Sequence, residues 1–121
     1  MVESRQTGWQ GEELAARWLL DEGFSLLHRN WRYGQYELDL VASKQGVLHI
    51  VEVKTRHKNS LTTPEQALDH RKTQALVRAA RAYLEQHPFC GEVQFDLIAI
   101  EIGADTPPEL RYIEDTVELH W

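Results

Sequence analysis

Residues 47–54 read VLHIVEVK and give the strongest β-strand signal in the chain. Valine and isoleucine dominate this stretch, and both are enriched in strands because a branched side chain packs well on a pleated surface. The pair Gln45-Gly46 directly before it supplies turn residues. Because the run is largely apolar, we predict that this strand lies in the middle of a sheet.

Upstream of this strand, the sequence predicts a helix followed by a β-hairpin. In residues 11–22 the apolar residues recur at intervals of three and four, which places them on one face of a helix. Gly23 suits the left-handed position that ends a helix. The apolar run at residues 24–27 and the alternating run at residues 36–41, with Gly34 between them, indicate two paired strands.

Downstream, the sequence predicts a crossover helix and two further strands. A helix starts at Thr63-Pro64, where threonine caps and proline fits the first turn. It ends before His87-Pro88, because the residue before a proline avoids helical geometry. Residues 93–100 and 110–113 are β-rich. The predicted order is α-β-β-β-α-β-β, an α/β fold with a mixed sheet flanked by helices, and the crossover helix favours parallel pairing of the third and fourth strands.

Length and composition limit the class of protein. The chain has 121 residues, the usual size of one domain, and its apolar content of 42% suffices for one continuous core. A single cysteine, Cys90, forms no internal disulfide, and six histidines without paired cysteines give no ordinary zinc framework. Residues 1–10 lack the apolar segment of a signal peptide, and no stretch approaches the roughly 20 apolar residues of a membrane helix. We predict one cytoplasmic domain over residues 1–121, with no membrane partner.

Charge is distributed unevenly along the chain, whose formal net charge is −6. Residues 44–81 carry eight lysines and arginines against three acids, whereas residues 82–121 carry one arginine against nine acids. A basic segment beside an acidic tail predicts one face that attracts phosphate and another that repels it. A solvated surface of mixed charge explains the same distribution.

Strand alternation places four charged side chains. Glu52 and Lys54 project from one face, as do Glu37 and Asp39 on the preceding strand. If the strands are neighbours, Asp39 and Glu52 can share a divalent ion, because Mg²⁺ prefers oxygen ligands and is often held by one or two carboxylates. Lys54 beside that ion would orient an attacking water, stabilise charge on a phosphate, or act as a base. The simpler alternative is an exposed Glu–Lys pair at a strand end, without a catalytic role.

A series of short motifs runs along nearly the whole chain. The motifs are Gly11-Glu12 with Ala15, Arg29-Asn30, Glu37-Leu38-Asp39-Leu40-Val41, Val51-Glu52-Val53-Lys54-Thr55-Arg56, Lys72 and Phe95-Asp96. In this order they resemble the uncharacterised bacterial family UPF0102, often called the YraN family. That family in turn resembles the restriction-endonuclease-like PD-(D/E)xK superfamily, where its nearest relatives look like archaeal Holliday-junction resolvases.

The resemblance implies a restriction-endonuclease-like fold and a metal-dependent site. Carried over by position, it makes Asp39 and Glu52 ligands of Mg²⁺ or Mn²⁺ and Lys54 the catalytic lysine. It also implies that Glu12 is an additional metal-binding acid that reaches in from the first helix. The alternative for Glu12 is an acid in the first turn of a helix, where the helix dipole favours it.

Three further positions belong to the implied site. The backbone carbonyl of Val53 is a further candidate metal ligand. Glu37 is a candidate catalytic acid, or a residue that supports the ligands. Tyr36 departs from the family's pattern, in which a glycine usually stands before this glutamate, but the departure leaves both acids in place.

Four basic residues, Arg56, Lys58, Arg71 and Lys72, are candidate nucleic-acid contacts. An ordinary exposed residue is the commoner explanation for each of them taken singly. The four tryptophans offer stacking surfaces for bases, but burial is the commoner fate of such side chains. Asp96 is expected to pair with a nearby basic residue.

The leading functional hypothesis is a metal-dependent DNA endonuclease that hydrolyses phosphodiester bonds, with branched or damaged DNA as candidate substrates. The first alternative is a nucleic-acid-binding or scaffolding module with weak or no catalysis, which the acidic net charge and the small size favour. The second is a protein-interaction role of the acidic region at residues 103–121. The expected partners are DNA and, because resolvase-like relatives use two sites on a symmetric junction, a second copy in a homodimer.

Overall fold

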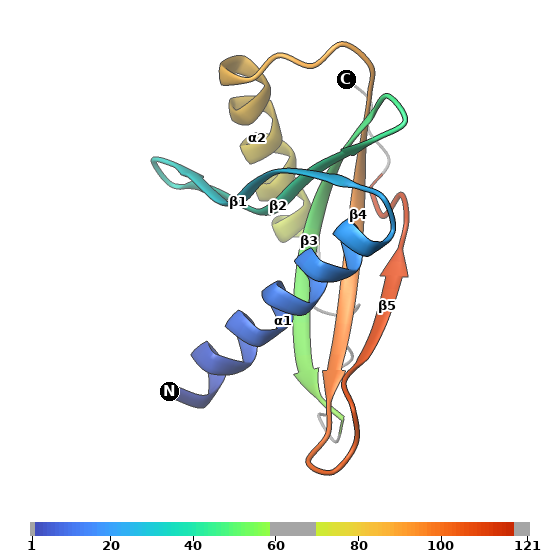
Figure 1. The fold of residues 1–121 in the computed structure, drawn as a ribbon. Helices are drawn as coiled ribbons and strands as arrows, with labels where there is room; N and C mark the ends of the chain where they lie inside the picture. Colours follow the sequence, from blue (N-terminus) through green and yellow to red (C-terminus); the bar gives the residue numbers. More distant parts are fainter. Residues whose placement is uncertain (1, 59–69, 118–121) are drawn as a thin grey trace.

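Two helices and five strands follow one another along the described residues in the predicted order α-β-β-β-α-β-β (Figure 1). The structure, a computed structural model, describes residues 2–58 and 70–117, with side chains from residues 10–58 and 71–117. The predicted mixed sheet flanked by helices is confirmed. The elements are α1 (Val2–Asp21), β1 (Ser25–Tyr33), β2 (Tyr36–Lys44), β3 (Val47–His57), α2 (His70–Gln86), β4 (Glu92–Ile102) and β5 (Glu109–Ile113).

Two elements are longer than predicted. α1 begins at Val2, well before the predicted start at residue 11, because the preceding residues contain no proline and include glutamate, arginine and glutamine. β1 continues to Tyr33 because its polar half pairs with β2, so tertiary pairing and not strand propensity sets its length. The predicted start of the second helix at Thr63-Pro64 lies outside the described residues, and its end at Gln86 agrees with the prediction.

β3 is the middle strand of the sheet, whose order is β1-β2-β3-β4-β5. It runs antiparallel to β2 and parallel to β4, with α2 in the connection between β3 and β4 (Figure 1). The turn between β2 and β3 consists of Gln45 and Gly46, whose φ angles of 50° and 80° are both positive. A two-residue turn of this kind matches the right-handed twist of the strands and fixes their register, which starts at the pair Lys44 and Val47.

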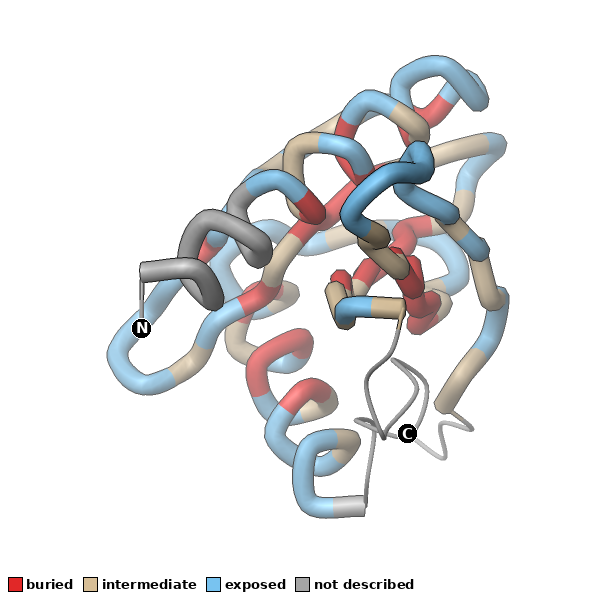
Figure 2. Tube along the Cα trace, turned by 90° about the horizontal axis from the view of Figure 1, so that it is seen from below, coloured by how far each residue is buried: buried red, intermediate tan, exposed pale blue. Residues whose placement is uncertain are grey.

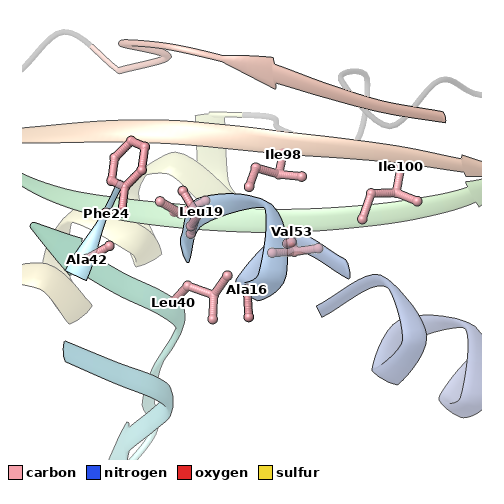
Figure 3. Packing of buried hydrophobic residues seen from close by; sticks show 10 residues of the cluster. Ala16, Leu19, Phe24, Leu40, Ala42, Val53, Ile98 and Ile100 are labelled. Atoms are coloured by element: carbon pink, nitrogen blue, oxygen red, sulfur yellow. The ribbon is translucent and has the colours of Figure 1, made fainter. Parts of the chain in front are cut away.

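The two helices cover opposite faces of the sheet, and each face has its own apolar core. Because side chains alternate along β3, Val51 and Val53 pack under α1, whereas Leu48 and Ile50 pack under α2. Buried positions lie along the strands and on the sheet-facing sides of the helices (Figure 2). The α1-side core (Figure 3) consists of Ala15, Ala16, Leu19, Phe24, Leu40, Ala42, Val51, Val53, Ile98 and Ile100; the α2-side core consists of Trp31, Leu38, Val41, Leu48, Ile50, Leu76, Ala79, Ala80, Tyr83 and Phe95.

A buried polar group, here called the Asp96 cluster, lies against the α1-side core and consists of Asp96, His49 and Tyr112. One carboxylate oxygen of Asp96 hydrogen-bonds with His49 Nδ1 at 2.6 Å and accepts a bond from the Tyr112 hydroxyl at 2.5 Å. The other oxygen accepts bonds from Gln94 Nε2 at 2.8 Å and from the backbone N–H of Asp115 at 3.1 Å. Asp96 thus joins β3, β4, β5 and the segment that follows β5.

The described tryptophans contribute to the cores. Trp31 is buried in the α2-side core, and Trp18 packs partly buried against the α1-side core, 4.8 Å from the Tyr112 ring. The side chains of Trp9 and Trp121 lie outside the described residues. In the part of the chain that the structure describes, neither helix combines the length and the apolar character needed to cross a membrane.

Candidate active site

The candidate site lies where β2 and β3 separate. Their ladder runs from Lys44 and Val47 to Leu40 and Val51, and it ends there. At this fork Asp39 Oδ2 accepts a hydrogen bond from the backbone N–H of Val53 at 2.9 Å. A carboxylate therefore bonds the backbone of the neighbouring strand just beyond the last paired residues. Beyond the ladder, residues 36–38 of β2 pair with β1 and residues 52–57 of β3 pair with β4, so the two strands part at this point (Figure 1).

Glu52 and Lys54 project from the face of β3 that carries Ile50 and faces α2. The Lys54 Nζ lies 3.5 Å from Glu52 Oε1, and the two side chains are 22% and 18% exposed. The predicted shared face is present, and the pair is much less exposed than an ordinary ion pair at a strand end. Partial burial strengthens the interaction between the two charges, because less water screens them.

The electrostatics of Glu52 set it apart among the acids of the site. Burial raises its pKa to about 8, and the negative charge of Asp39 and a hydrogen bond with it act in the same direction. Lys54 opposes the rise without cancelling it. Two carboxyl groups in contact disfavour double ionisation, so at neutral pH the pair retains a proton unless another cation takes its place.

Glu12 approaches the same acids from α1, on the other side of the sheet. Burial and the negative charge of Asp39 raise the pKa of Glu12, and a hydrogen bond with Asn30 and the charge of Arg29 partly offset this. Gly11 allows the close approach, since a Cβ at this position would overlap Thr55 Oγ1 on β3. The helix therefore crosses β3 closely, which brings Glu12 into the electrostatic field of Asp39.

A cleft of about 510 Å³ opens beside the fork, between the β1–β2 hairpin tip and α2. Glu52 and Lys54 contribute from β3, the hairpin tip forms one wall, and α2 forms the other. Its lining mixes apolar, acidic and basic groups, which suits a polar ligand that also carries an apolar part. The residues that line it are Gln35, Tyr36, Glu37, Glu52, Lys54, Lys72, Ala75, Leu76 and Arg78.

Several of the predicted site residues come together in or beside this cleft. Glu37, Glu52, Lys54 and Lys72 line it, and Asp39 contacts Glu52 at the fork. Glu37 is exposed and lies 3.5 Å from Arg32 Nε. These placements agree with the predicted site, whereas the catalytic roles remain predictions.

The other predicted nucleic-acid contacts lie apart from the lining. Lys58 donates to Thr106 Oγ1 at 2.9 Å and pairs with Glu109 at 3.0 Å, at the opposite end of β3 from the Gln45-Gly46 turn. Arg56 is partly buried and donates to the backbone carbonyl of Thr55 at 2.9 Å. Arg71 is exposed near the start of α2.

Sequence reasoning missed two polar residues of the cleft. Gln35 lies at the hairpin tip between β1 and β2, and the pairing of Arg32 with Glu37 places this tip beside the acids. Arg78 was counted only in the charge balance. Helical spacing could have identified Arg78. In a helix, Lys72 and Arg78 each lie three or four residues from Ala75 or Leu76, so both basic side chains flank these two positions.

Tyr36, where the resemblance expects glycine, begins β2 with regular pairing opposite Tyr33. The backbone at this position therefore does not need the conformational freedom of glycine. The side chain of Tyr36 forms part of the cleft wall.

The donor set can be compared with what a divalent ion requires. Among residues 10–58 and 71–117 no three or more His, Cys, Asp or Glu side chains are grouped closely enough to form a complete metal centre. Asp39 and Glu52 nevertheless fit Mg²⁺, which keeps several waters and is commonly held by one or two carboxylates together with substrate phosphate. Burial, and then the charge of Asp39, raise the pKa of Glu52 and so disfavour its ionised form, and a bound cation would offset that cost.

Comparison with known proteins agrees with the resemblance seen in the motifs. The model of a family described as "Uncharacterised protein family UPF0102" matches residues 11–100, a range that includes Glu12, Asp39, Glu52 and Lys54. A UPF0102 protein of Bacteroides thetaiotaomicron is 43% identical over 115 residues, which cover 95% of this chain and 94% of the relative.

Two further relatives carry the same description. A UPF0102 protein of Phocaeicola vulgatus is 38% identical over 115 residues, which cover 95% of this chain and 94% of the relative. One of Nitratidesulfovibrio vulgaris is 39% identical over 121 residues, which cover 98% of this chain and 90% of the relative. The chain therefore belongs to the uncharacterised protein family UPF0102.

Proposed function

We propose that this protein is a metal-dependent DNA endonuclease that hydrolyses phosphodiester bonds in the cleft beside β3. The observation that carries the proposal is the fork between β2 and β3, where Asp39, Glu52 and Lys54 meet at a cleft. Two carboxylates and a lysine on adjacent strands also agree with the resemblance to the PD-(D/E)xK superfamily. A shared fold alone would not carry an activity, so the proposal rests on the side chains of the site.

Each side chain of the site would have its own role in hydrolysis. Asp39 and Glu52 would hold Mg²⁺ or Mn²⁺, and the N–H of Val53 fixes the orientation of the Asp39 carboxylate. When bound, such an ion supplies charge neutralisation at the phosphate and lowers the pKa of a water. The oxygen of the attacking water bonds to phosphorus, one P–O ester bond breaks, and the leaving oxygen takes up a proton. The Lys54 ammonium would stabilise the negative charge that develops on the phosphate.

The α2 wall supports a phosphate-containing substrate. Lys72 and Arg78 line the cleft opposite the hairpin tip, and both side chains can donate to phosphate oxygens. Glu37, on the hairpin side, is kept as a supporting acid of the site. The net charge of −6 disfavours broad binding along duplex DNA, so the substrate would be engaged locally at this cleft.

The activity test uses purified protein with Mg²⁺ or Mn²⁺ and labelled linear, single-stranded, flapped and four-way-junction DNA. We expect cleavage that requires the ion and is lost in Lys54→Ala, with flapped or branched substrates preferred. Absence of cleavage across the whole panel would reject the proposal.

Ion binding is tested separately by calorimetry. Asp39→Ala should abolish the binding of Mn²⁺, because it removes one of the two carboxylates at the fork. A matched control is Glu109→Ala, which removes an exposed acid that pairs with Lys58 away from the cleft. Unchanged ion binding in Asp39→Ala would reject the site as described.

The small size and the acidic net charge of the chain favour a second candidate function, a nucleic-acid-binding module with little or no catalysis. A carboxyl pair that already holds a proton at neutral pH can persist without a metal ion. This protein would bind branched DNA with a steep dependence on salt, and binding would survive Lys54→Ala. Binding without cleavage in the DNA panel distinguishes it from the endonuclease.

A homodimer belongs to the endonuclease proposal, because a symmetric four-way junction presents two equivalent cutting sites. Sedimentation of the protein with and without a four-way junction tests this expectation. Two copies per junction would support it, and one copy per junction would contradict it.

A further inference from the structure

The β1–β2 hairpin tip carries aromatic residues at the mouth of the cleft. Tyr33 and Tyr36 are paired across the tip. The Tyr36 side chain lines the cleft and packs, partly buried, against the α2-side core. Tyr33 is 54% exposed, stacks on Trp31 with ring centroids 6.3 Å apart, and is not among the described residues that line the cleft.

The opposite wall of the cleft differs in chemistry. Lys72 and Arg78 of α2 flank the small and apolar side chains of Ala75 and Leu76. The cleft therefore has a tyrosine ring on the hairpin side and cations on the α2 side. A nucleotide has the matching parts, since its base offers a flat face for an aromatic ring and its phosphate takes hydrogen bonds from cations.

The size of the cleft limits what enters it. A volume of about 510 Å³ falls within the usual range of small-ligand pockets and suits a single nucleotide. A base inside a duplex is stacked on both of its faces, so it reaches Tyr36 only after it is extruded from the helix. A base that is already unpaired needs no such step, and the cleft would select for it.

We propose that this cleft binds one unpaired nucleotide of a DNA strand, with the base against Tyr36 and the phosphate toward Lys72 and Arg78. This inference rests on the proposed function and names its substrate: DNA with an unpaired nucleotide next to the phosphodiester at Glu52 and Lys54. Branched and damaged DNA both expose such nucleotides, so the same contact explains why either would be preferred.

The test measures binding separately from hydrolysis. Two oligonucleotide duplexes carry the fluorescent base 2-aminopurine, one in a single-nucleotide bulge and one in a fully paired position. They are titrated with protein in EDTA at pH 7, so that no divalent ion is present and no hydrolysis occurs. We expect the bulged duplex to bind at least tenfold more tightly than the paired one, with quenching of the bulged 2-aminopurine by stacking.

Matched variants locate the contact. Tyr36→Leu keeps an apolar side chain against the core but removes the ring, and it should weaken binding of the bulged duplex about tenfold while leaving the paired duplex unchanged. Tyr36→Phe should retain both affinity and quenching. Tyr33→Leu, on the other strand of the same tip, is the control and should behave as the wild type.

A second variant keeps the test decisive if Tyr36→Leu does not fold. Ala75 is exposed on α2 and lines the cleft, so Ala75→Leu fills the cleft without entering the core. It should also weaken binding of the bulged duplex about tenfold. Equal binding of the two duplexes by the wild type, or bulge binding that survives both Tyr36→Leu and Ala75→Leu, would overturn the inference.

Failure of the nucleotide-site inference can be distinguished from failure of the proposed endonuclease function. If the bulged duplex is bound through Tyr36 but is not cut with Mg²⁺ or Mn²⁺, the nucleotide site stands and the endonuclease proposal falls. If paired and bulged duplexes are cut equally by the wild type and by Tyr36→Leu, the endonuclease stands and the nucleotide site falls.

Discussion

The Asp96 cluster and the fork between β2 and β3 both place carboxyl groups against a largely apolar sheet, but they differ in how those groups are satisfied. Asp96 is 0% exposed and takes part in four hydrogen bonds, two on each oxygen. Glu52 lies beside one lysine and a second carboxylate, and its pKa is raised to about 8.

This difference indicates different roles for the two sets of carboxyl groups. A carboxylate whose oxygens are fully hydrogen-bonded gains little from a ligand, and its bonds instead hold neighbouring strands together. A buried carboxyl group beside a second one is costly to ionise, and a cation that reaches the pair would lower that cost. On this basis we expect the Asp96 cluster to have a structural role and the charged groups beside the cleft, on the α2 side of the sheet, to be the ones that bind a ligand.

The largest expected effect on stability follows from breaking the Asp96 cluster. Asp96→Ala leaves the buried His49 and the partly buried Tyr112 without their acceptor, so we expect a loss of about 3–4 kcal/mol in the free energy of unfolding, measured by urea denaturation. The control Glu109→Ala removes an exposed acid and should cost about 0.5 kcal/mol or less. A loss below about 1 kcal/mol in Asp96→Ala would contradict the structural role of the cluster.

Lys54→Ala, unlike Asp96→Ala, should affect DNA cleavage much more than stability. We expect the rate of metal-dependent DNA cleavage to fall roughly 100-fold or more, because a charge-stabilising group is removed, while the free energy of unfolding changes by about 1 kcal/mol or less. Rates come from single-turnover cleavage of a flapped substrate. Lys44→Ala is the matched control, a lysine at the far end of β2 that donates to the backbone carbonyl of Glu22 and does not line the cleft. Equal rates in the two variants would remove Lys54 from the mechanism.

Glu52→Gln should reveal how much the ionised carboxylate of Glu52 destabilises the folded protein. The pKa of Glu52 in the folded protein, about 8, lies above its ordinary value of 4.5. Between these values the unfolded chain loses this proton while the folded protein keeps it, so the contribution of Glu52 to stability falls as pH rises and its penalty is complete above pH 8. Glu52→Gln should therefore be more stable than the wild type at pH 8, and this difference should shrink steadily as the pH is lowered and vanish near pH 4.

Denaturation in urea at a series of pH values, with a chelator present, measures this difference. Glu37→Gln changes an exposed acid of the same cleft and serves as the control. A stability difference between Glu52→Gln and the wild type that does not change with pH would show that ionisation of Glu52 carries no penalty.

Much of the site could be predicted because it depends on local geometry. The shared face of Glu52 and Lys54 follows from the two-residue period of a strand. The contact between Asp39 and Glu52 follows from the two-residue turn at residues 45–46, since pairing outward from that turn brings these residues opposite each other just beyond the last ladder pair. Element order and the central place of β3 likewise follow from apolar patterning and connection length.

What could not be predicted depends on contacts between distant segments. The position of Arg78 in the cleft depends on the rotation of α2 about its axis. Packing of Leu76 and its neighbours in the α2-side core sets this rotation. Lys58 was a candidate phosphate contact, but its partner Glu109 lies on a strand some fifty residues later. The extension of β1 required the facing strand β2.

The smallest expected effect concerns the close approach of α1 to β3. In a helix, Gly11→Ala would ordinarily stabilise by about 1 kcal/mol, but here the added Cβ overlaps Thr55 Oγ1. We expect the overlap to outweigh the gain, so that Gly11→Ala destabilises the protein by about 1 kcal/mol. In a Thr55→Ala background the Oγ1 is absent and only the Cβ of residue 55 stays close, at 3.2 Å, so the same substitution should cost about 1 kcal/mol less than in the wild type. This difference, measured in a double-mutant cycle by urea denaturation, identifies the steric contact, and equal effects in both backgrounds would mean that the Thr55 hydroxyl is not what requires glycine at this position.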